Sequence, residues 1–209
     1  MPAASTPSGV IAIIRLREQR AVDEIFQALL DGGVRAVEVT ADTPGAFEAV
    51  TRWRGKGSAL VGVGTVRTPA MTRRAIDAGA EFLVTPTTMP EVLEIAGAAG
   101  VPVAAGALSP TEIDTAWHHG AAAVKVFPVD TVGGPAYIRA VQAPLSDVPL
   151  VPTGGVDASA ARTYAGMGCV GVGVGSALVD ERIVAAGDWS ELQSRAAALA
   201  AAWSQGLAG

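Results

Sequence analysis

Lys125 is the residue of this chain whose surroundings best fit covalent chemistry. The sequence contains two lysines and thirteen arginines, and Lys125 lies in an apolar run from Ala121 to Val129. Such a β-branched run predicts a buried strand, where lysine is rare. Unlike arginine, a lysine in a dry pocket can lose its proton and attack a carbonyl group to form a Schiff base. The alternative is a lysine at a strand end that reaches water or pairs with a carboxylate.

Glu38 is a second charge in the middle of an apolar strand. It is flanked by two valines, and strand alternation puts it on the same face as Thr40. One interpretation is a structural ion pair of Glu38 with Lys125 or with Arg15, which would add little stability because desolvation offsets the attraction. We favour a functional pair, in which Lys125 is the covalent nucleophile and Glu38 transfers protons.

Two glycine-rich turns have the composition of an anion site. Gly154 and Gly155 follow one predicted strand, and a run that includes Gly175 and Ser176 follows the next. Glycines let backbone N–H groups approach a ligand, and barrel enzymes often bind phosphate after their last two strands. Either run alone would often be only a tight turn, but the two together predict a phosphate site.

Predicted strands and helices alternate along the whole chain. The strands are expected at 10–15, 36–40, 59–64, 82–85, 101–105, 122–127, 150–153 and 170–174. The helices are expected at 21–31, 44–53, 68–78, 90–99, 110–119, 135–143, 158–166 and 189–205. Eight such pairs predict a single (β/α)8 TIM barrel over residues 1–209, with its chemistry at the carboxyl ends of the strands. An open doubly wound sheet is the alternative, but the Gly-x-Gly-x-x-Gly turn of its dinucleotide-binding form is missing.

Three helix starts share one local signal. Thr43, Thr68 and Ser109 each precede a proline, which predicts an N-cap hydroxyl followed by proline at the first helical position. Gly79 and Gly100 stand where two of the helices should end.

Composition excludes several functional classes. The net charge is −5 and the basic residues are scattered, so neither nucleic-acid nor membrane-surface binding is predicted. No segment has the ~18 continuous apolar residues that a membrane span needs. The N-terminal residues lack the layout of a signal peptide, and the single Cys169 excludes an internal disulfide. We therefore expect a cytoplasmic protein.

Five segments resemble those of one enzyme family. They are EVT with a following TP (38–40 and 43–44), VGVGTV (61–66), AVKVFP (123–128), PTGGV (152–156) and VGVGSAL (172–178). In this order they resemble the 2-keto-3-deoxy-6-phosphogluconate aldolase family, which includes 2-keto-3-deoxy-6-phosphogalactonate and 4-hydroxy-2-oxoglutarate aldolases. The resemblance implies a class I aldolase without metal ion or cofactor, which acts on a small-molecule keto acid and assembles as a homotrimer. Its products would be pyruvate and glyceraldehyde 3-phosphate.

The resemblance also implies roles for the reacting end of the site. Lys125 would form the Schiff base with C2 of the keto acid, and Glu38 would shuttle protons through water. Thr65, helped by Thr153, would hold the pyruvate-like carboxylate. Arg15 would contact the substrate or fix Glu38.

The remaining roles concern the distal end of the substrate. Phe127 would pack against the bound ligand. The phosphate would be held by Gly154, Gly155, Gly175 and Ser176.

One departure from the family pattern concerns the substrate. Many relatives carry an arginine where this chain has Asp42, and replacing a bidentate cation by an anion is not conservative. The chemistry is therefore expected to be kept while the aldehyde-side preference differs. The galactonate epimer and unphosphorylated 4-hydroxy-2-oxoglutarate remain alternative substrates. A barrel that binds a phosphorylated metabolite without catalysis, or a metal-dependent pyruvate aldolase, are the rival functions.

Overall fold

The structure, a computed structural model, describes residues 6–18 and 21–208. Residues 1–5, part of the stretch without a signal-peptide layout, lie outside the described residues. The strands are β1 (Gly9–Ile14), β2 (Ala36–Thr40), β3 (Leu60–Gly64), β4 (Phe82–Val84), β5 (Val103–Ala107), β6 (Ala123–Val126), β7 (Leu150–Pro152) and β8 (Gly171–Val174). The helices are α1 (Val22–Asp31), α2 (Ala46–Trp53), α3 (Pro69–Asp77), α4 (Pro90–Ala98), α5 (Pro110–His118), η1 (Asp130–Val132), α6 (Pro135–Gln142), α7 (Ala158–Gly166), α8 (Glu181–Ala186) and α9 (Trp189–Leu207).

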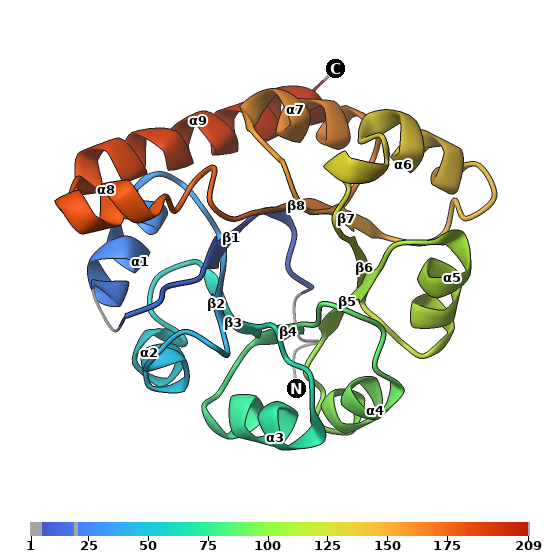
Figure 1. Ribbon diagram of the computed structural model, residues 1–209, viewed down its shortest axis with the longest axis horizontal. Coiled ribbons are helices and arrows are strands. Elements are labelled where there is room, and N and C mark those ends of the chain that lie inside the picture. The colour runs from blue at the N-terminus through green and yellow to red at the C-terminus, as the bar shows by residue number, and fades with distance from the viewer. Residues whose placement is uncertain (1–5, 19–20, 209) are drawn as a thin grey trace.

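The strands form one parallel sheet that closes on itself. Its hydrogen-bonded order is β7-β6-β5-β4-β3-β2-β1-β8. The two end strands also meet, because Thr153 forms a bridge with Gly173 and the Val170 N–H donates to the Leu150 carbonyl at 3.1 Å. The predicted (β/α)8 TIM barrel is therefore confirmed, and Figure 1 shows its helices as an outer ring around the strands.

Alternation along the strands separates two apolar layers. The small cluster inside the barrel consists of Ile11, Ala36, Phe82, Val84, Ala104, Ala123 and Val151. The intervening strand residues, such as Val37 and Val124, belong to a larger cluster shared with the helices. Glu38 and Lys125 each lie two residues beyond a member of the inner cluster. They therefore face the barrel interior, toward the carboxyl ends of the strands.

The predicted N-cap hydroxyl before a proline is found at two of the three helix starts and is missing at the third. Thr68 and Ser109 accept hydrogen bonds from backbone N–H groups in the first turns of α3 and α5, as predicted. The prediction for Thr43 is wrong, because α2 begins at Ala46 and its N-cap residue is Gly45, whose backbone has the left-handed conformation. The Thr43 hydroxyl instead accepts a hydrogen bond from the Leu16 N–H at 3.1 Å.

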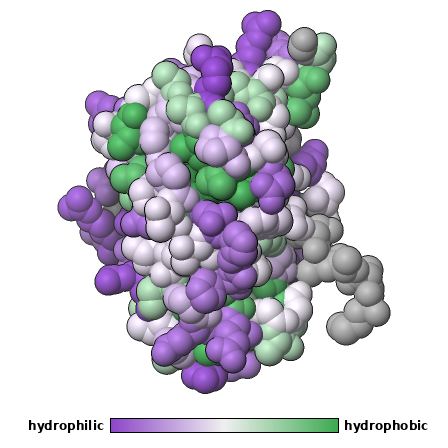
Figure 2. Space-filling model, turned by 90° about the vertical axis from the view of Figure 1, so that its right-hand side faces the viewer, coloured by the Kyte–Doolittle hydropathy of each residue, from purple (hydrophilic) through white to green (hydrophobic). Residues whose placement is uncertain are grey.

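Helix α9 joins distant parts of the chain on the outside of the barrel. It has 19 residues and packs against α7 and α1, so that the C-terminal region covers the region around β1. The face drawn in Figure 2 mixes hydrophilic and hydrophobic residues. Among the described residues, no helix combines the length and the apolar character that a membrane crossing requires.

Candidate active site

The carboxyl ends of the strands surround a cavity of about 1260 Å³. The structure brings all but one of the predicted site residues to its lining: Arg15, Thr65, Lys125, Phe127, Thr153, Gly154, Gly155, Gly175 and Ser176. The remaining one, Glu38, lies buried beneath the lining. The arrangement gathers residues that lie in, or directly after, six strands at one place, while the roles of these residues stay predictions.

Lys125 is positioned by strand β6 in the wall of the cavity. It pairs in register with Gly106 on β5 and with Val151 on β7. The strand residues on either side of it are buried, whereas Lys125 itself is half-buried and opens to the cavity. Its Nζ lies 5.4 Å from the ring centroid of Phe127, a side chain that is 43% exposed despite being apolar. An amine in this place is accessible to a ligand and has an aromatic face beside it.

Glu38 is buried without a full set of partners. It is 1% exposed, and in the described part of the chain its Oε2 atom has no hydrogen-bond partner. Burial raises the pKa of this carboxyl group, while the charges of Lys125 and Arg15 act in the opposite direction. Within the same described residues, no ion pair joins Glu38 to Lys125 or to Arg15. The structural ion pair is therefore not formed, and a raised pKa suits a group that exchanges protons.

Gly64 creates the space that the Glu38 carboxyl group occupies. It pairs with Thr40 at the end of β3, and a Cβ atom at this position would lie 2.7 Å from the Glu38 carboxyl. Any larger residue would have to displace the carboxylate. The glycine of this strand end is thus part of the arrangement that holds Glu38.

Arg15 is held between two groups at the rim of the cavity. Its Nη2 donates to Thr65 Oγ1 at 2.8 Å, and its Nη1 lies 3.9 Å from Asp42 Oδ2. Thr65 has a positive φ of 58°, which is uncommon for a residue other than glycine and tends to occur at functional sites. The guanidinium therefore makes one short hydrogen bond to a residue with a strained backbone and one long contact with an exposed carboxylate.

Thr43 ties the loops that carry these two charges together. It is 2% exposed, and its Oγ1 accepts from the Leu16 N–H and lies 3.0 Å from Thr40 Oγ1. Leu16 directly follows Arg15, and Thr43 directly follows Asp42. The proximity of Arg15 and Asp42 is thus set by the backbone and not only by two long side chains.

Among the glycines of the predicted phosphate turns, Gly155 leaves no room for a side chain, whereas Gly175 does. Gly154 and Gly155 both have positive φ angles, 101° and 65°. A Cβ atom on Gly155 would lie 2.5 Å from the carboxylate of Asp130, and one on Gly173 would overlap the side chain of Thr153. Glycine at these positions lets the backbone N–H groups come close to a ligand, as anion sites require.

Several charged residues of the cavity were missed in the sequence. These are Arg17, Arg67, Asp180, Glu181 and Arg182, which lie in the segments that follow β1, β3 and β8. Asp42 also lines the cavity, although it was recognised only as a departure from a family pattern. The available signal was their position within a few residues of a predicted strand end. It is weak, because charged residues are common in loops.

A family model and a curated relative each match most of this chain. The model of the KDPG and KHG aldolase family, where KDPG is 2-keto-3-deoxy-6-phosphogluconate and KHG is 4-hydroxy-2-oxoglutarate, matches residues 3–195. A 2-dehydro-3-deoxy-phosphogluconate aldolase from Treponema pallidum is 36% identical over 184 residues, which cover 88% of each chain.

Two solved structures share the architecture. The native KDPGal structure superposes with a TM-score of 0.88 and 30% identity, covering 98% of both chains. The KDPG aldolase of Legionella pneumophila, with pyruvate captured as a covalent carbinolamine intermediate, superposes with a TM-score of 0.83 and 28% identity, covering 92% of this chain and 94% of the other.

Proposed function

The chain belongs to the KDPG and KHG aldolase family, and from this we propose that it cleaves KDPG to pyruvate and glyceraldehyde 3-phosphate through a Schiff base on Lys125. Membership makes the protein a carbon–carbon lyase of the class I aldolase type. The observation that carries the assignment of residues is the buried Glu38 carboxyl group, whose Oε2 has no partner among the described residues, in electrostatic range of a cavity-lining lysine. A pair of this kind matches the two groups that the reaction needs.

The chemistry follows from these two residues. The neutral amine of Lys125 attacks C2 of the keto acid, and the carbinolamine loses water to give an iminium ion. Glu38 takes the proton of the C4 hydroxyl group while the C3–C4 bond breaks, and the electron pair of that bond moves into the iminium to form an enamine. The aldehyde leaves, Glu38 helps to return a proton to C3, and hydrolysis releases pyruvate and restores the lysine.

The rest of the cavity supplies binding groups. We assign the carboxylate of the keto acid to Arg15 and Thr65, which are joined by a hydrogen bond of 2.8 Å, with Thr153 beside them. A guanidinium donates to a carboxylate in a bidentate geometry.

The distal end of the substrate is assigned to the lining residues that follow β6, β7 and β8. Phe127 packs against the substrate, and the glycine turns with Ser176 bind its phosphate. The Gly154 and Gly155 backbone, with its positive φ angles, is the support for the phosphate assignment.

A steady-state assay with four substrates tests the proposal. KDPG, its galactonate epimer, KHG and unphosphorylated 2-keto-3-deoxygluconate are compared by kcat/KM, with pyruvate release measured for each. The proposal predicts the highest value for KDPG. A higher value for the galactonate epimer would assign the chain to that substrate, in line with its similarity to the native KDPGal structure. A preference for KHG, which carries no phosphate group, would contradict the assignment of a phosphate site.

The assembly and location are proposed on the family resemblance. We propose a cytoplasmic homotrimer of single-domain chains, with a mass of three times 21.0 kDa. Size-exclusion chromatography with light scattering measures that mass directly, and a monomer mass would contradict the trimer.

A further inference from the structure

We propose that Arg182 is the cation that binds the phosphate group of the substrate, and that Asp180 competes with the phosphate for its guanidinium. This inference rests on the proposed function and assigns a charge to a site that otherwise consists of backbone groups and a hydroxyl. Asp180 thereby sets how tightly the phosphate is held.

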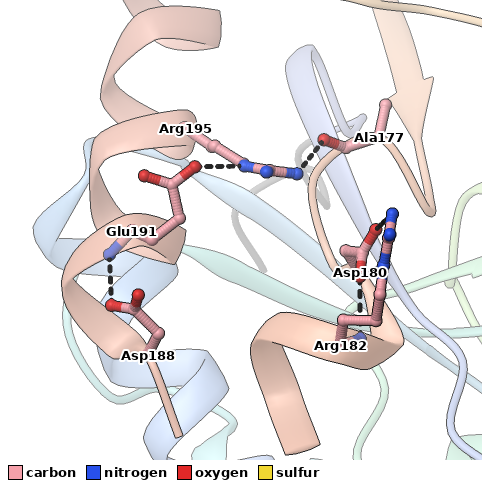
Figure 3. Close-up of polar contacts among 6 residues, drawn as sticks. All are labelled: Ala177, Asp180, Arg182, Asp188, Glu191 and Arg195. Carbon is pink, nitrogen blue, oxygen red and sulfur yellow. Dashed lines mark hydrogen bonds and ion pairs between the residues drawn. The ribbon is translucent and has the colours of Figure 1, made fainter. Parts of the chain in front are cut away.

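Arg182 belongs to the same segment as the predicted phosphate ligand Ser176. The segment runs from β8 into α8, and Ser176, Asp180 and Arg182 all line the one cavity. Figure 3 shows the Arg182 side chain beside Asp180 at the start of α8. A single chain segment therefore brings both a hydroxyl group and a guanidinium to the lining of this cavity.

The contact between Arg182 and Asp180 is weak enough to be exchanged. Both guanidinium contacts, Nε to Oδ1 and Nη2 to Oδ2, are 3.4 Å long, at the far end of hydrogen-bonding distance. The Arg182 side chain is 93% exposed, and exposed ion pairs contribute little. A phosphate dianion offers more charge and three acceptor oxygens, so it competes well for a guanidinium.

The backbone around Arg182 is fixed, so that only its side chain needs to move. The Asp180 carboxylate caps α8 by accepting from the Arg182 N–H at 2.7 Å. Arg195 on α9 reaches the Ala177 carbonyl at 3.5 Å and is itself held by Glu191 at 2.7 Å. The short cap contact fixes the backbone at Arg182, while its long side chain, which is 93% exposed, remains free to turn.

The other arginines of the cavity are less suited to this role. Arg15 donates to Thr65 at 2.8 Å and is assigned to the keto-acid end of the substrate. Arg67 follows β3, which two strands separate from β8 in the sheet order. Arg17 pairs with Glu181 at 3.3 Å and is the remaining competitor, which the experiment must separate from Arg182.

Two neighbouring variants with opposite expected effects test the proposal. Arg182→Gln should raise KM for KDPG by about 10–100-fold with kcat changed by less than about threefold, because one charge-assisted contact to the phosphate is lost. Asp180→Asn keeps a good N-cap side chain but weakens the hold on Arg182, so it should lower KM by about 2–5-fold. Inorganic phosphate, used as a competitive inhibitor, should show inhibition constants that move in the same two directions.

Matched controls exclude general effects of charge. Arg139→Gln removes an exposed arginine from α6 outside the cavity and should leave KM for KDPG and phosphate inhibition unchanged. Circular dichroism melting curves check that all variants are folded. A purely structural role of the Asp180–Arg182 pair predicts that both variants weaken binding, and that result would overturn the proposal.

The remaining outcomes are also decisive. If Arg17→Gln and not Arg182→Gln weakens phosphate inhibition, the phosphate cation is Arg17 and the proposal is wrong. Trapping of pyruvate on Lys125 of the unchanged protein with borohydride tests the proposed function separately. Trapping on Lys125 with no effect of Arg182→Gln would remove only this inference, whereas absence of trapping would remove the proposed function itself.

Discussion

The carboxyl group of Glu38 combines burial with an incomplete set of hydrogen bonds, and both properties affect catalysis. Replacing it in Glu38→Gln keeps the shape but removes the base, so turnover should fall by about 10²–10⁴-fold while KM for KDPG stays near its original value.

The base must be ionised, so kcat/KM of the unchanged protein should fall as the pH drops through the raised pKa of Glu38. A pH profile of kcat/KM that keeps the same acidic limb in Glu38→Gln would contradict this role.

The same raised pKa has a consequence for stability. Because burial favours the protonated carboxyl, the folded state loses stability as the pH rises from the ordinary value of 4.5 through the raised pKa of Glu38. Glu38→Gln should therefore melt at a higher temperature than the unchanged protein above this range and at a similar temperature below pH 4.5. Each kcal/mol of unfolding free energy gained by the variant corresponds to a melting temperature about 2–4 °C higher. Melting curves at pH 4 and pH 8 measure the difference, and a variant that is less stable at pH 8 would refute it.

Residues of the site differ in how visible they are in the sequence. Lys125 and Glu38 could be found because each interrupts an apolar strand, where a charge is costly. Asp42 lies in the loop after β2 and Arg182 in the first turn of α8, where charged residues are ordinary, and only the closure of the barrel places them at the cavity. Their position at the cavity depends on three-dimensional proximity, which local patterns do not contain.

The contact between the loops after β1 and β2 depends on Thr43. In Thr43→Val the buried Leu16 N–H loses its acceptor, which should cost about 1–3 kcal/mol of folding free energy. Because Arg15 precedes Leu16, the keto-acid end of the cavity should also be misplaced and kcat/KM should fall, by up to about 10²-fold. Thermal unfolding and the KDPG assay measure the two effects.

Thr68→Ala is the control for this change. It removes an N-cap hydroxyl from α3, at a cost of about 1 kcal/mol, in a residue that does not line the cavity. The two variants should therefore lose similar stability, while only Thr43→Val loses activity. An equal loss of kcat/KM in both would show that the effect comes from stability alone.

The eight strands and eight helices expected from the sequence lie within about two residues of their bounds in the structure, because period and capping chemistry are local properties. The short helices η1 and α8 were not among the expected ranges. Thr43 shows where this approach fails. Its threonine–proline pair looks like the one at Thr68, yet a long-range donor, the Leu16 N–H, takes up its hydroxyl and α2 starts at Ala46 instead. A local pattern cannot distinguish a capping hydroxyl from one that is used by a distant strand.

The barrel as a whole is stabilised on the outside by α9, which packs against α7 and α1. Gly206 lies where a Cβ atom would overlap the carbonyl oxygen of Arg162 on α7. Gly206→Ala should therefore destabilise the fold by about 1–3 kcal/mol through overpacking. The kcat of the folded protein should be unchanged, since the contact is outside the cavity. Chemical denaturation and a low-temperature assay test both statements.

Gly97→Ala is the matched control for Gly206→Ala, and it is expected to raise stability instead of lowering it. Gly97 lies in α4, and among the described residues no atom outside its own helix backbone and chain neighbours lies within 4 Å of the place that a Cβ atom would take. Alanine should therefore fit there and stabilise the helix by about 0.5–1 kcal/mol. A loss of stability in both variants would show that the packing of α9 is not the cause of the Gly206 effect.

The fold was predictable from eight alternating strand and helix patterns, which leave few architectures other than a closed parallel barrel. The details of closure were not predictable. They depend on Thr153 meeting Gly173 across the seam between β7 and β8, and this pairing joins residues with no local signal for each other.

Covalent trapping of pyruvate is the most direct measurement of the proposed chemistry. The protein is incubated with pyruvate and borohydride, digested, and mapped by mass spectrometry. A reduced pyruvyl group is expected on Lys125, and Lys125→Arg should be folded but unlabelled and inactive because arginine has no usable amine. Labelling on Lys56, or no labelling at all, would contradict a Schiff-base mechanism at Lys125.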